Sequence, residues 1–262
     1  MKIGIDLGTA NILVFVQGRG ITVREPSVVV IGEGDRIMAV GNEAREMIGR
    51  TPGGMTAVRP LRDGVIADYV VTEAMLRYFI KKGTAGKLTF GRPDVLVSVP
   101  ASSTSVEKRY VLDAARQAGA GKAFLIEEPM AAAIGAELPI SGPSGNMIVN
   151  IGGGTAEIAV LSLSEIVVSK SHRVGGNRFD EAIALYIRRK YNLMIGDRTA
   201  EQVKIDIGSA VTMDKELTMS VKGRDMIAGL PREVTINSTE ITEALEVPLR
   251  NLTDAVRSVL EQ

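Results

Sequence analysis

Apolar and polar residues alternate in short runs along this chain, and two groups of three such runs share one layout. The first group predicts strands over residues 2–6, 12–16 and 21–24, and the second group over residues 146–151, 157–161 and 166–171. A tight glycine turn joins the first two strands of each group, at Gly8 in one and at Gly152 to Gly154 in the other. We interpret the two groups as an internal duplication, in which Asp6 and Asn150 hold corresponding places.

Strands and helices alternate in the rest of the chain. A helix ending at Gly119 is predicted to begin with a capping box, because Thr104 and Glu107 have the required spacing. Further strands are predicted over 94–99, 123–126, 217–222 and 233–237, and further helices over 127–136, around 179–187 and around 200–207. A last helix begins near Thr239 and is expected to be interrupted by Pro248. This order predicts an α/β fold in which helices cover sheets.

The length of 262 residues is sufficient for two lobes, each with its own core. A loop rich in Pro, Ser and Gly over residues 139–145 is the expected boundary. We therefore expect a first lobe over 1–142, with a small insertion at about 32–68, and a second lobe over 143–262. In the second lobe, residues 143–177 and 241–262 would form a large subdomain and about 178–240 a small one.

Composition narrows the class of function. The 31 basic and 31 acidic residues cancel, and the chain has no Trp, so we expect no nucleic-acid partner. The absence of cysteine excludes disulfides and thiolate metal sites, and agrees with a cytoplasmic location. We expect no signal peptide, because the first strand begins at Lys2, and no apolar run is long enough to span a bilayer. Binding of a small molecule is favoured.

The two glycine turns predict phosphate binding. Glycines at such a turn let main-chain N–H groups converge on phosphate oxygens without obstruction from a Cβ atom. Thr9, Asn11 and Thr155 can add side-chain donors. One turn alone would be weak support, because glycine at a hairpin commonly serves only the backbone conformation. Two facing turns could hold two successive phosphates, with Asp6 organising the waters of a Mg²⁺ ion.

Several stretches carry a resemblance to known proteins. In chain order, Asp6 to Thr9, Glu127 to Ala133 and Gly152 to Thr155 resemble the actin and DnaK-type ATPase superfamily. Within that superfamily, Gly8 to Asn11, Arg59 to Tyr69 and Tyr191 to Gly196 are similar to the bacterial MreB family of actin-like cell-shape proteins. These motifs span nearly the whole chain, so the resemblance is specific.

The resemblance implies an actin-like ATPase fold, with two lobes that are each built on a duplicated strand-hairpin plus helix core of the ribonuclease H type. It also implies ATP and Mg²⁺ as cofactors in the cleft between the lobes. The expected partners are further copies of the chain in filaments, the cytoplasmic membrane surface and the cell-wall elongation machinery. The expected location is the cytoplasm, peripheral on the inner face of the cell membrane.

The resemblance also assigns roles to individual residues. Asp6 would bind Mg²⁺ through water and act in catalysis with Glu128, which orients the attacking water, and with Thr155. The expected nucleotide contacts are Gly8, Thr9, Ala10 and Asn11 in the first turn, Asn150, Gly152, Gly153, Gly154 and Thr155 at the second, and Glu201, Gln202, Val203 and Lys204 near the ribose and adenine.

Simpler readings of some of these residues stay open. Glu127 and Glu128 could merely supply negative charge at a helix N-terminus, where a carboxylate is favourable by about 0.3–1 kcal/mol. Glu201 and Lys204, three residues apart on a helix, could be a solvated ion pair. A small-molecule kinase or phosphatase of the same superfamily is the alternative function, whereas a chaperone-type ATPase would need a substrate-binding domain after the ATPase unit.

A membrane contact is predicted at Leu88 and Phe90, in an expected loop with Lys82, Lys87 and Arg92 around them. Apolar side chains flanked by cations suit an anionic membrane surface. The sequence slightly favours the alternative, in which the loop folds its own apolar residues inward.

Two departures from the family pattern affect these expectations. Asn150 stands where the family has Asp, which replaces a charged acceptor with a neutral amide. The chain also ends before the family's glycine-rich adenine-binding turn, so we expect an incomplete second lobe and weak nucleotide binding.

We predict that Asn150 slows ATP hydrolysis without abolishing nucleotide binding, because a water on Mg²⁺ loses a charge-assisted hydrogen bond. The variant Asn150→Asp should therefore release phosphate faster than the parent when both are saturated with ATP and Mg²⁺. Equal rates in the two proteins would contradict the prediction.

Overall fold

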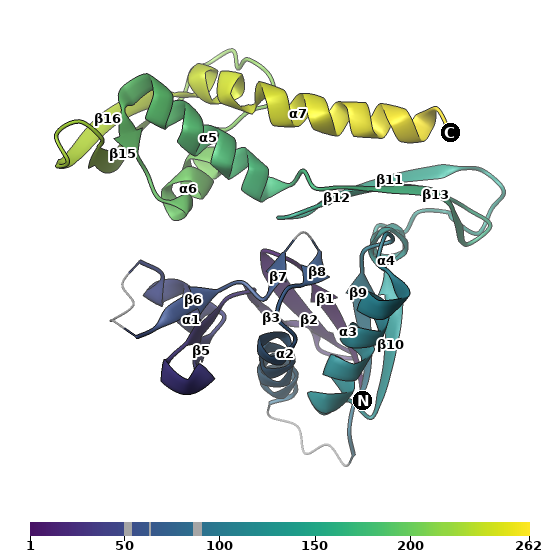
Figure 1. Ribbon diagram of the computed structural model, residues 1–262. Helices are drawn as coiled ribbons and strands as arrows, with labels where there is room; N and C mark the ends of the chain where they lie inside the picture. Colours follow the sequence, from purple (N-terminus) through teal and green to yellow (C-terminus); the bar gives the residue numbers. More distant parts are fainter. Residues whose placement is uncertain (50–53, 63, 86–90) are drawn as a thin grey trace. The chain divides into compact units, whose positions relative to one another are not determined.

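The computed structural model describes residues 1–49, 54–62, 64–85 and 91–262 (Figure 1). Its contacts divide the chain into two compact units, Met1–Ser171 and His172–Gln262. The lobe boundary expected after residue 142 stays a prediction.

The first unit is built on a five-stranded sheet in the order β10-β9-β1-β2-β3. Its strands are β1 (Lys2–Leu7), β2 (Asn11–Val16), β3 (Gly20–Pro26), β9 (Asp94–Val99) and β10 (Lys122–Glu127). Strands β1, β2 and β3 are antiparallel, whereas β9 pairs in parallel with β1 and with β10. Alternate residues such as Ile5, Val14 and Val97 are buried under α2 (Tyr69–Thr84) and α3 (Ser105–Gln117). The predicted capping box at Thr104 and Glu107 is confirmed.

A small insertion lies between β3 and α2. It contains β4 (Val29–Ile31), a 3₁₀ turn (Glu33–Asp35), β5 (Ile37–Val40), α1 (Asn42–Met47), β6 (Thr56–Val58), β7 (Leu61–Arg62) and β8 (Val65–Ile66). Buried Glu25 of β3 ties it to the main sheet. Its Oε1 is 2.6 Å from Lys82 Nζ on α2, and its Oε2 accepts the Asn42 N–H at 3.0 Å.

The second copy of the strand group is a three-stranded sheet in the order β11-β12-β13, seen edge-on in Figure 1. It consists of β11 (Asn146–Ile151), β12 (Ala156–Ser162) and β13 (Glu165–His172). Helix α4 (Glu128–Gly135) packs on this sheet, with Ala133 in one cluster with Ala159 and Leu161. Both predicted strand groups are therefore confirmed.

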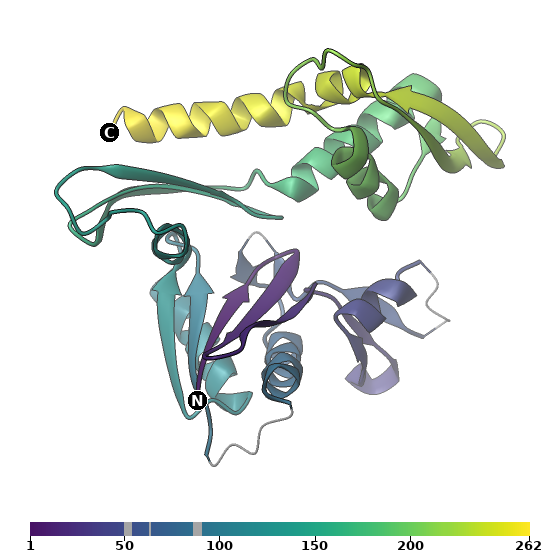
Figure 2. The ribbon, with the colours of Figure 1, turned by 180° about the vertical axis from the view of Figure 1, so that it is seen from behind.

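The second unit has a hydrophobic core of its own. It contains α5 (Gly176–Tyr191), β14 (Leu193–Met194), α6 (Asp197–Ile207), β15 (Thr218–Asp225), β16 (Pro231–Asn237) and α7 (Ser238–Leu260), with an antiparallel sheet in the order β14-β15-β16 (Figure 2). Ile187 of α5, Val203 of α6 and Ile241 of α7 meet in this core.

The expected interruption of the last helix at Pro248 is wrong, because α7 continues through it to Leu260. Proline removes the hydrogen bond to the carbonyl four residues earlier and costs about 3 kcal/mol in a helix interior. Pro248 is buried, as are Leu245 and Leu252 on the same stripe. Burial of this stripe offsets the lost hydrogen bond.

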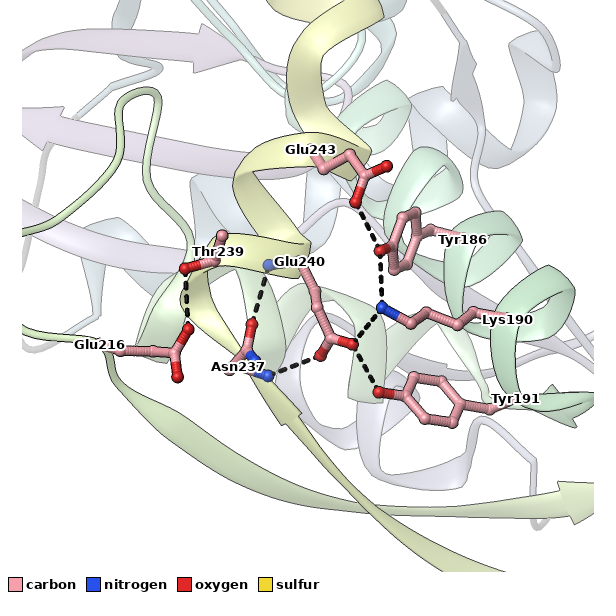
Figure 3. A network of polar contacts seen from close by, with 8 residues as sticks. All are labelled: Tyr186, Lys190, Tyr191, Glu216, Asn237, Thr239, Glu240 and Glu243. Carbon is pink, nitrogen blue, oxygen red and sulfur yellow. Dashed lines mark hydrogen bonds and ion pairs between the residues drawn. The ribbon is translucent and has the colours of Figure 1, made fainter.

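Polar contacts join α5 to the start of α7 (Figure 3). Buried Glu240 accepts hydrogen bonds from Tyr191 Oη at 2.5 Å and from Lys190 Nζ at 2.7 Å on one oxygen, and from the Asn237 N–H at 2.9 Å on the other. Nearby, Tyr186 Oη donates to Glu243 Oε2 at 2.7 Å. At the same end of α7, Thr239 donates to Glu216 at 2.8 Å.

Burial by itself would raise the pKa of Glu240. The hydrogen bonds from Lys190, Tyr191 and the Asn237 backbone outweigh it, so the pKa lies below the ordinary value of 4.5. A carboxyl whose pKa is lower in the folded than in the unfolded state stabilises the fold above its unfolded pKa. That contribution is lost as the pH falls through the folded pKa.

We predict that Glu240→Gln lowers the free energy of unfolding at pH 7 by about 1.5–3 kcal/mol, because it removes charge-assisted hydrogen bonds at a buried carboxylate. Urea denaturation of the full chain measures the change. Glu243→Gln is the matched control on the same helix, since Glu243 is exposed. The difference between Glu240→Gln and the parent should shrink below pH 4, and a difference that stays constant would contradict the role of charge.

Candidate functional site

The two glycine turns have the same close backbone approach at corresponding positions. A Cβ atom on Gly8 would lie 2.5 Å from the Asn11 carbonyl oxygen, and one on Gly152 would lie 3.2 Å from the Thr155 carbonyl oxygen. The Gly152 N–H also donates to the Thr155 carbonyl at 2.8 Å. The duplication read from the sequence therefore extends to the geometry of the turns.

The turns lie against each other within the first unit. A Cβ atom on Gly153 would lie 2.4 Å from Ala10 Cβ and 3.3 Å from Ala10 N. No side chain fits at such a separation, so glycine is required where the second turn meets the first. The predicted phosphate residues of both turns are thus brought together.

A third segment reaches the same place. The Gly64 N–H donates to Thr9 Oγ1 at 2.9 Å. Gly64 has φ +79°, and a Cβ atom there would lie 2.7 Å from Pro100 Cγ and 3.6 Å from Thr155 Cγ2. This glycine belongs to the stretch Arg59 to Tyr69, which the sequence reasoning used only for the resemblance. The Asp63-Gly64 dipeptide, a common hairpin turn, was the signal available for it.

Two serines that the sequence reasoning missed hold the first turn. Ser27 Oγ donates to the Gly8 carbonyl at 2.5 Å, and Ser98 Oγ donates to Asp6 Oδ1 at 3.1 Å. Asp6 is at the end of β1 with its side chain exposed. Crowding by the surrounding protein raises its pKa, and the Ser98 hydrogen bond partly opposes this effect. Asp6 is therefore held in place and open to a ligand.

Glu127 and Glu128 have different surroundings. Glu127 Oε1 is 2.9 Å from Lys108 Nζ and forms an ion pair. Burial, with added repulsion from Asp6 and Glu157, raises the pKa of Glu128 to about 7. A carboxyl group that titrates near neutral pH suits a general base. A role as negative charge at the helix N-terminus does not explain why Glu127 is paired with a lysine while Glu128 has a raised pKa.

Glu157 is a further acid that the sequence reasoning missed, because it lies within an apolar strand. It is fully buried, and burial raises its pKa. Its Oε2 accepts the Ala101 N–H at 3.3 Å. The Ser171 side chain also hydrogen-bonds to this carboxyl group, and both hydrogen bonds partly oppose the effect of burial on the pKa.

Glycine turns that exclude Cβ atoms fit phosphate groups, and an exposed carboxylate at a strand end fits a water of a Mg²⁺ ion. Within the part of the chain that the structure describes, no three His, Cys, Asp or Glu side chains lie close enough to hold a metal ion directly.

The remaining predicted nucleotide residues lie on α6 in the second unit. Val203 is in the core, and Gln202 donates to Asp206 at 2.7 Å. Lys204 Nζ lies 2.8 Å from Asp180 Oδ1 and donates to the Gly176 carbonyl at 3.2 Å, which joins α6 to the start of α5. A role for Glu201 to Lys204 near the ribose and adenine stays a prediction.

The predicted membrane residues, Leu88 and Phe90, lie outside the described residues. In the described ranges, no helix combines the length and the apolar character that crossing a membrane requires.

Comparison with known proteins identifies relatives over the whole chain. The family model for the MreB/Mbl protein matches residues 1–262. The cell shape-determining protein MreB of Escherichia coli strain K12 is 52% identical over 265 residues, which cover 99% of this chain and 76% of that protein. The cell shape-determining protein Mbl of Bacillus subtilis strain 168 is 49% identical over 261 residues, which cover 99% of this chain and 78% of that protein.

Solved structures of other proteins are also similar to this chain. The crystal structure of MreB5 of Spiroplasma citri bound to AMPPNP has a TM-score of 0.93 and 39% identity, and the match covers 99% of this chain and 78% of that one. The same protein bound to ADP matches equally well. A MamK double helical filament, at 23% identity and a TM-score of 0.81, supports the fold alone. The fold is actin-like, as the sequence predicted, and the chain belongs to the MreB/Mbl family.

Proposed function

We propose that this protein is an ATP-binding, actin-like cytoskeletal protein that polymerises into filaments and helps to determine cell shape. One observation carries the proposal: the two phosphate turns meet, with Gly153 against Ala10, in a family whose curated members are named for cell shape. Nucleotide binding by the related MreB5 supports the cofactor, since that protein was solved with AMPPNP and with ADP.

In the proposed site, the first turn (Gly8 to Asn11) and the second (Gly152 to Thr155) bind the phosphates through main-chain N–H groups and the hydroxyls of Thr9 and Thr155. Asp6 would hold a water of a bound Mg²⁺ ion, and that ion would supply neutralising charge for the phosphates. Ser27, Ser98 and Gly64 fix these groups before ATP arrives. Glu201 to Lys204 contact the ribose and adenine side.

In hydrolysis, Glu128 orients a water and accepts its proton as the water oxygen bonds to the γ-phosphorus. The bond from that phosphorus to the β,γ-bridging oxygen breaks, and ADP and phosphate leave. Asn150 makes this step slow. A small-molecule kinase or phosphatase of the same superfamily is the weaker alternative, because the relatives at about 50% identity are cell-shape proteins.

We predict that the purified chain forms filaments with ATP and Mg²⁺, visible by negative-stain electron microscopy. Gly153→Ala should bind fluorescent ATP at least tenfold more weakly and form no filaments, because its Cβ would lie 2.4 Å from Ala10 Cβ. Gly135→Ala is the matched control, since a Cβ there meets nothing within 4 Å. Circular dichroism checks that both variants fold. Phosphorylation of a metabolite by a protein that forms no filaments would favour the alternative.

We also propose that the filaments lie on the inner face of the cell membrane, near the cell-wall elongation machinery, and that Leu88 and Phe90 insert into the bilayer surface. The double variant Leu88→Ser with Phe90→Ser should lose co-sedimentation with anionic liposomes, because it removes the two apolar side chains that are proposed to enter the lipid. Val70→Ser is a control at another exposed apolar residue. Unchanged sedimentation of the double variant would reject the membrane role.

A further inference from the structure

The hairpin formed by β15 and β16 ends in a turn that carries large apolar side chains. Ile227, Leu230 and Met226 are 83%, 65% and 44% exposed. Turns are usually rich in Gly, Asn, Asp, Pro and Ser, because these residues suit the backbone conformations that a turn needs. We call residues 226–230 the hairpin tip, which projects past α5 and α6 in Figure 1. Apolar side chains in such a place indicate a contact surface.

The hairpin tip is held in one conformation by the buried Asp225. Its Oδ1 accepts the N–H groups of Ile227 at 2.8 Å and Ala228 at 2.9 Å, and its Oδ2 lies 3.0 Å from Arg232 Nε. The Gly229 N–H donates to the Asp225 carbonyl at 2.9 Å. A surface that is already ordered loses little conformational entropy on binding. The exposed apolar side chains of the tip are therefore presented from a fixed backbone.

The charge beside the hairpin tip is positive. Arg224 is exposed, and its Nη2 lies 3.8 Å from the place that a Cβ atom on Gly229 would take. Asp225 neutralises Arg232, whereas Arg224 has no ion pair among the described residues. The tip itself, residues 226–230, contains no acidic side chain. A surface that binds this tip should be apolar and negatively charged.

A surface of that kind lies at one end of the β11-β12-β13 sheet. Leu163 and Val167 are 65% and 67% exposed, and Glu165 between them is exposed as well. We call these three residues the acidic patch. The Leu163 N–H donates to the Gly142 carbonyl at 3.0 Å, so the loop after α4 lies beside the patch. Residues 137–169 contain no Lys or Arg, which leaves the charge of Glu165 without a basic neighbour in the sequence.

The acidic patch is at the far end of β12 from the second glycine turn. Strand β12 begins at Ala156, next to that turn, and ends at Ser162, next to Leu163. A contact between the tip of one copy and the patch of another joins two different surfaces, so it leaves one tip and one patch unoccupied on the pair. Repetition of such a contact adds further copies and can build a filament. The glycine turns take no part in it.

We propose that the hairpin tip of one copy binds the acidic patch of the next copy, with Ile227 against Leu163 and Val167 and with Arg224 paired to Glu165. The inference rests on the proposed function, and it names the surfaces through which the filament grows. Each surface complements the other and repels itself, because two tips would bring two Arg224 side chains together and two patches would bring two Glu165 side chains together. This repulsion favours head-to-tail growth over closed pairs.

The apolar part of the contact is tested by pelleting assembled protein with ATP and Mg²⁺. Ile227→Ser combined with Leu230→Ser should raise the critical concentration by about tenfold or more, because apolar area that is buried on assembly is lost. Its affinity for fluorescent ATP should stay that of the parent. Ile205→Ser on α6, at a residue that is 65% exposed, is the matched control. An unchanged critical concentration overturns the contact, also where the variant instead loses binding to anionic liposomes.

The ion pair is tested by exchange of the two charges. Arg224→Glu and Glu165→Arg should each raise the critical concentration, and both changes in one chain should restore it to within about threefold of the parent, because the pair forms again with its charges reversed. Arg188→Glu, at an exposed residue near the end of α5, is the control for the change in net charge. A double variant that assembles no better than the single variants overturns the pairing.

Crosslinking tests directly which surfaces meet, because the chain has no cysteine of its own. Ile227→Cys and Leu163→Cys are mixed with ATP and Mg²⁺ and treated with a short bis-maleimide. Crosslinked dimers should form in the mixture and not in either variant alone. Dimers of Ile227→Cys alone would show that two tips meet, and absence of dimers from a mixture that assembles would show that the tip binds elsewhere. Either result overturns the proposal.

The outcomes separate this inference from the proposed function. A parent that assembles with ATP, together with tip and patch variants that assemble equally well, overturns only the tip-to-patch contact. A parent that forms no filaments with ATP and Mg²⁺ overturns the proposed function, and the contact with it.

Discussion

The close approach of two backbone turns, with Gly153 against Ala10, is the constraint on which the site depends. Phosphate groups need several main-chain N–H donors at one place, and side chains would keep those donors apart. Each turn comes from its own sheet, so the turns can meet only if both sheets are held in fixed positions within the first unit. Helix α4 provides a direct link, since it follows β10 of one sheet and packs on β12 of the other.

Short polar contacts then fix the surroundings of the meeting point. Thr9 accepts the Gly64 N–H, Ser27 donates to Gly8, and Ser98 donates to Asp6. Gly64 and Ser27 both lie between β3 and α2, and Ser98 lies in β9, so the candidate site draws on separate parts of the first unit. The second unit is held by separate contacts, among them the buried Glu240 between α5 and α7. The contribution of Glu240 to stability can therefore be tested by a substitution that leaves both glycine turns unchanged.

The distribution of charge distinguishes residues that the sequence leaves equivalent. Glu127 and Glu128 are adjacent and identical in type, yet Lys108 neutralises the first, and burial raises the pKa of the second to about 7. Asn150 is a further example, because the structure places it directly opposite the buried Glu157 on the neighbouring strand, a neighbour that the local sequence does not reveal.

The sequence by itself determined the strand groups, the glycine turns, the capping box at Thr104 and the family, because these depend on local spacing and on motifs. It failed at Pro248, where burial of the apolar stripe on α7 outweighs the preference of proline to end a helix. Only the tertiary structure decided that Gly64, Ser27, Ser98 and Glu157 belong to the site. Their roles come from contacts between residues distant in sequence, and burial and pairing of that kind leave no periodic signal along the chain.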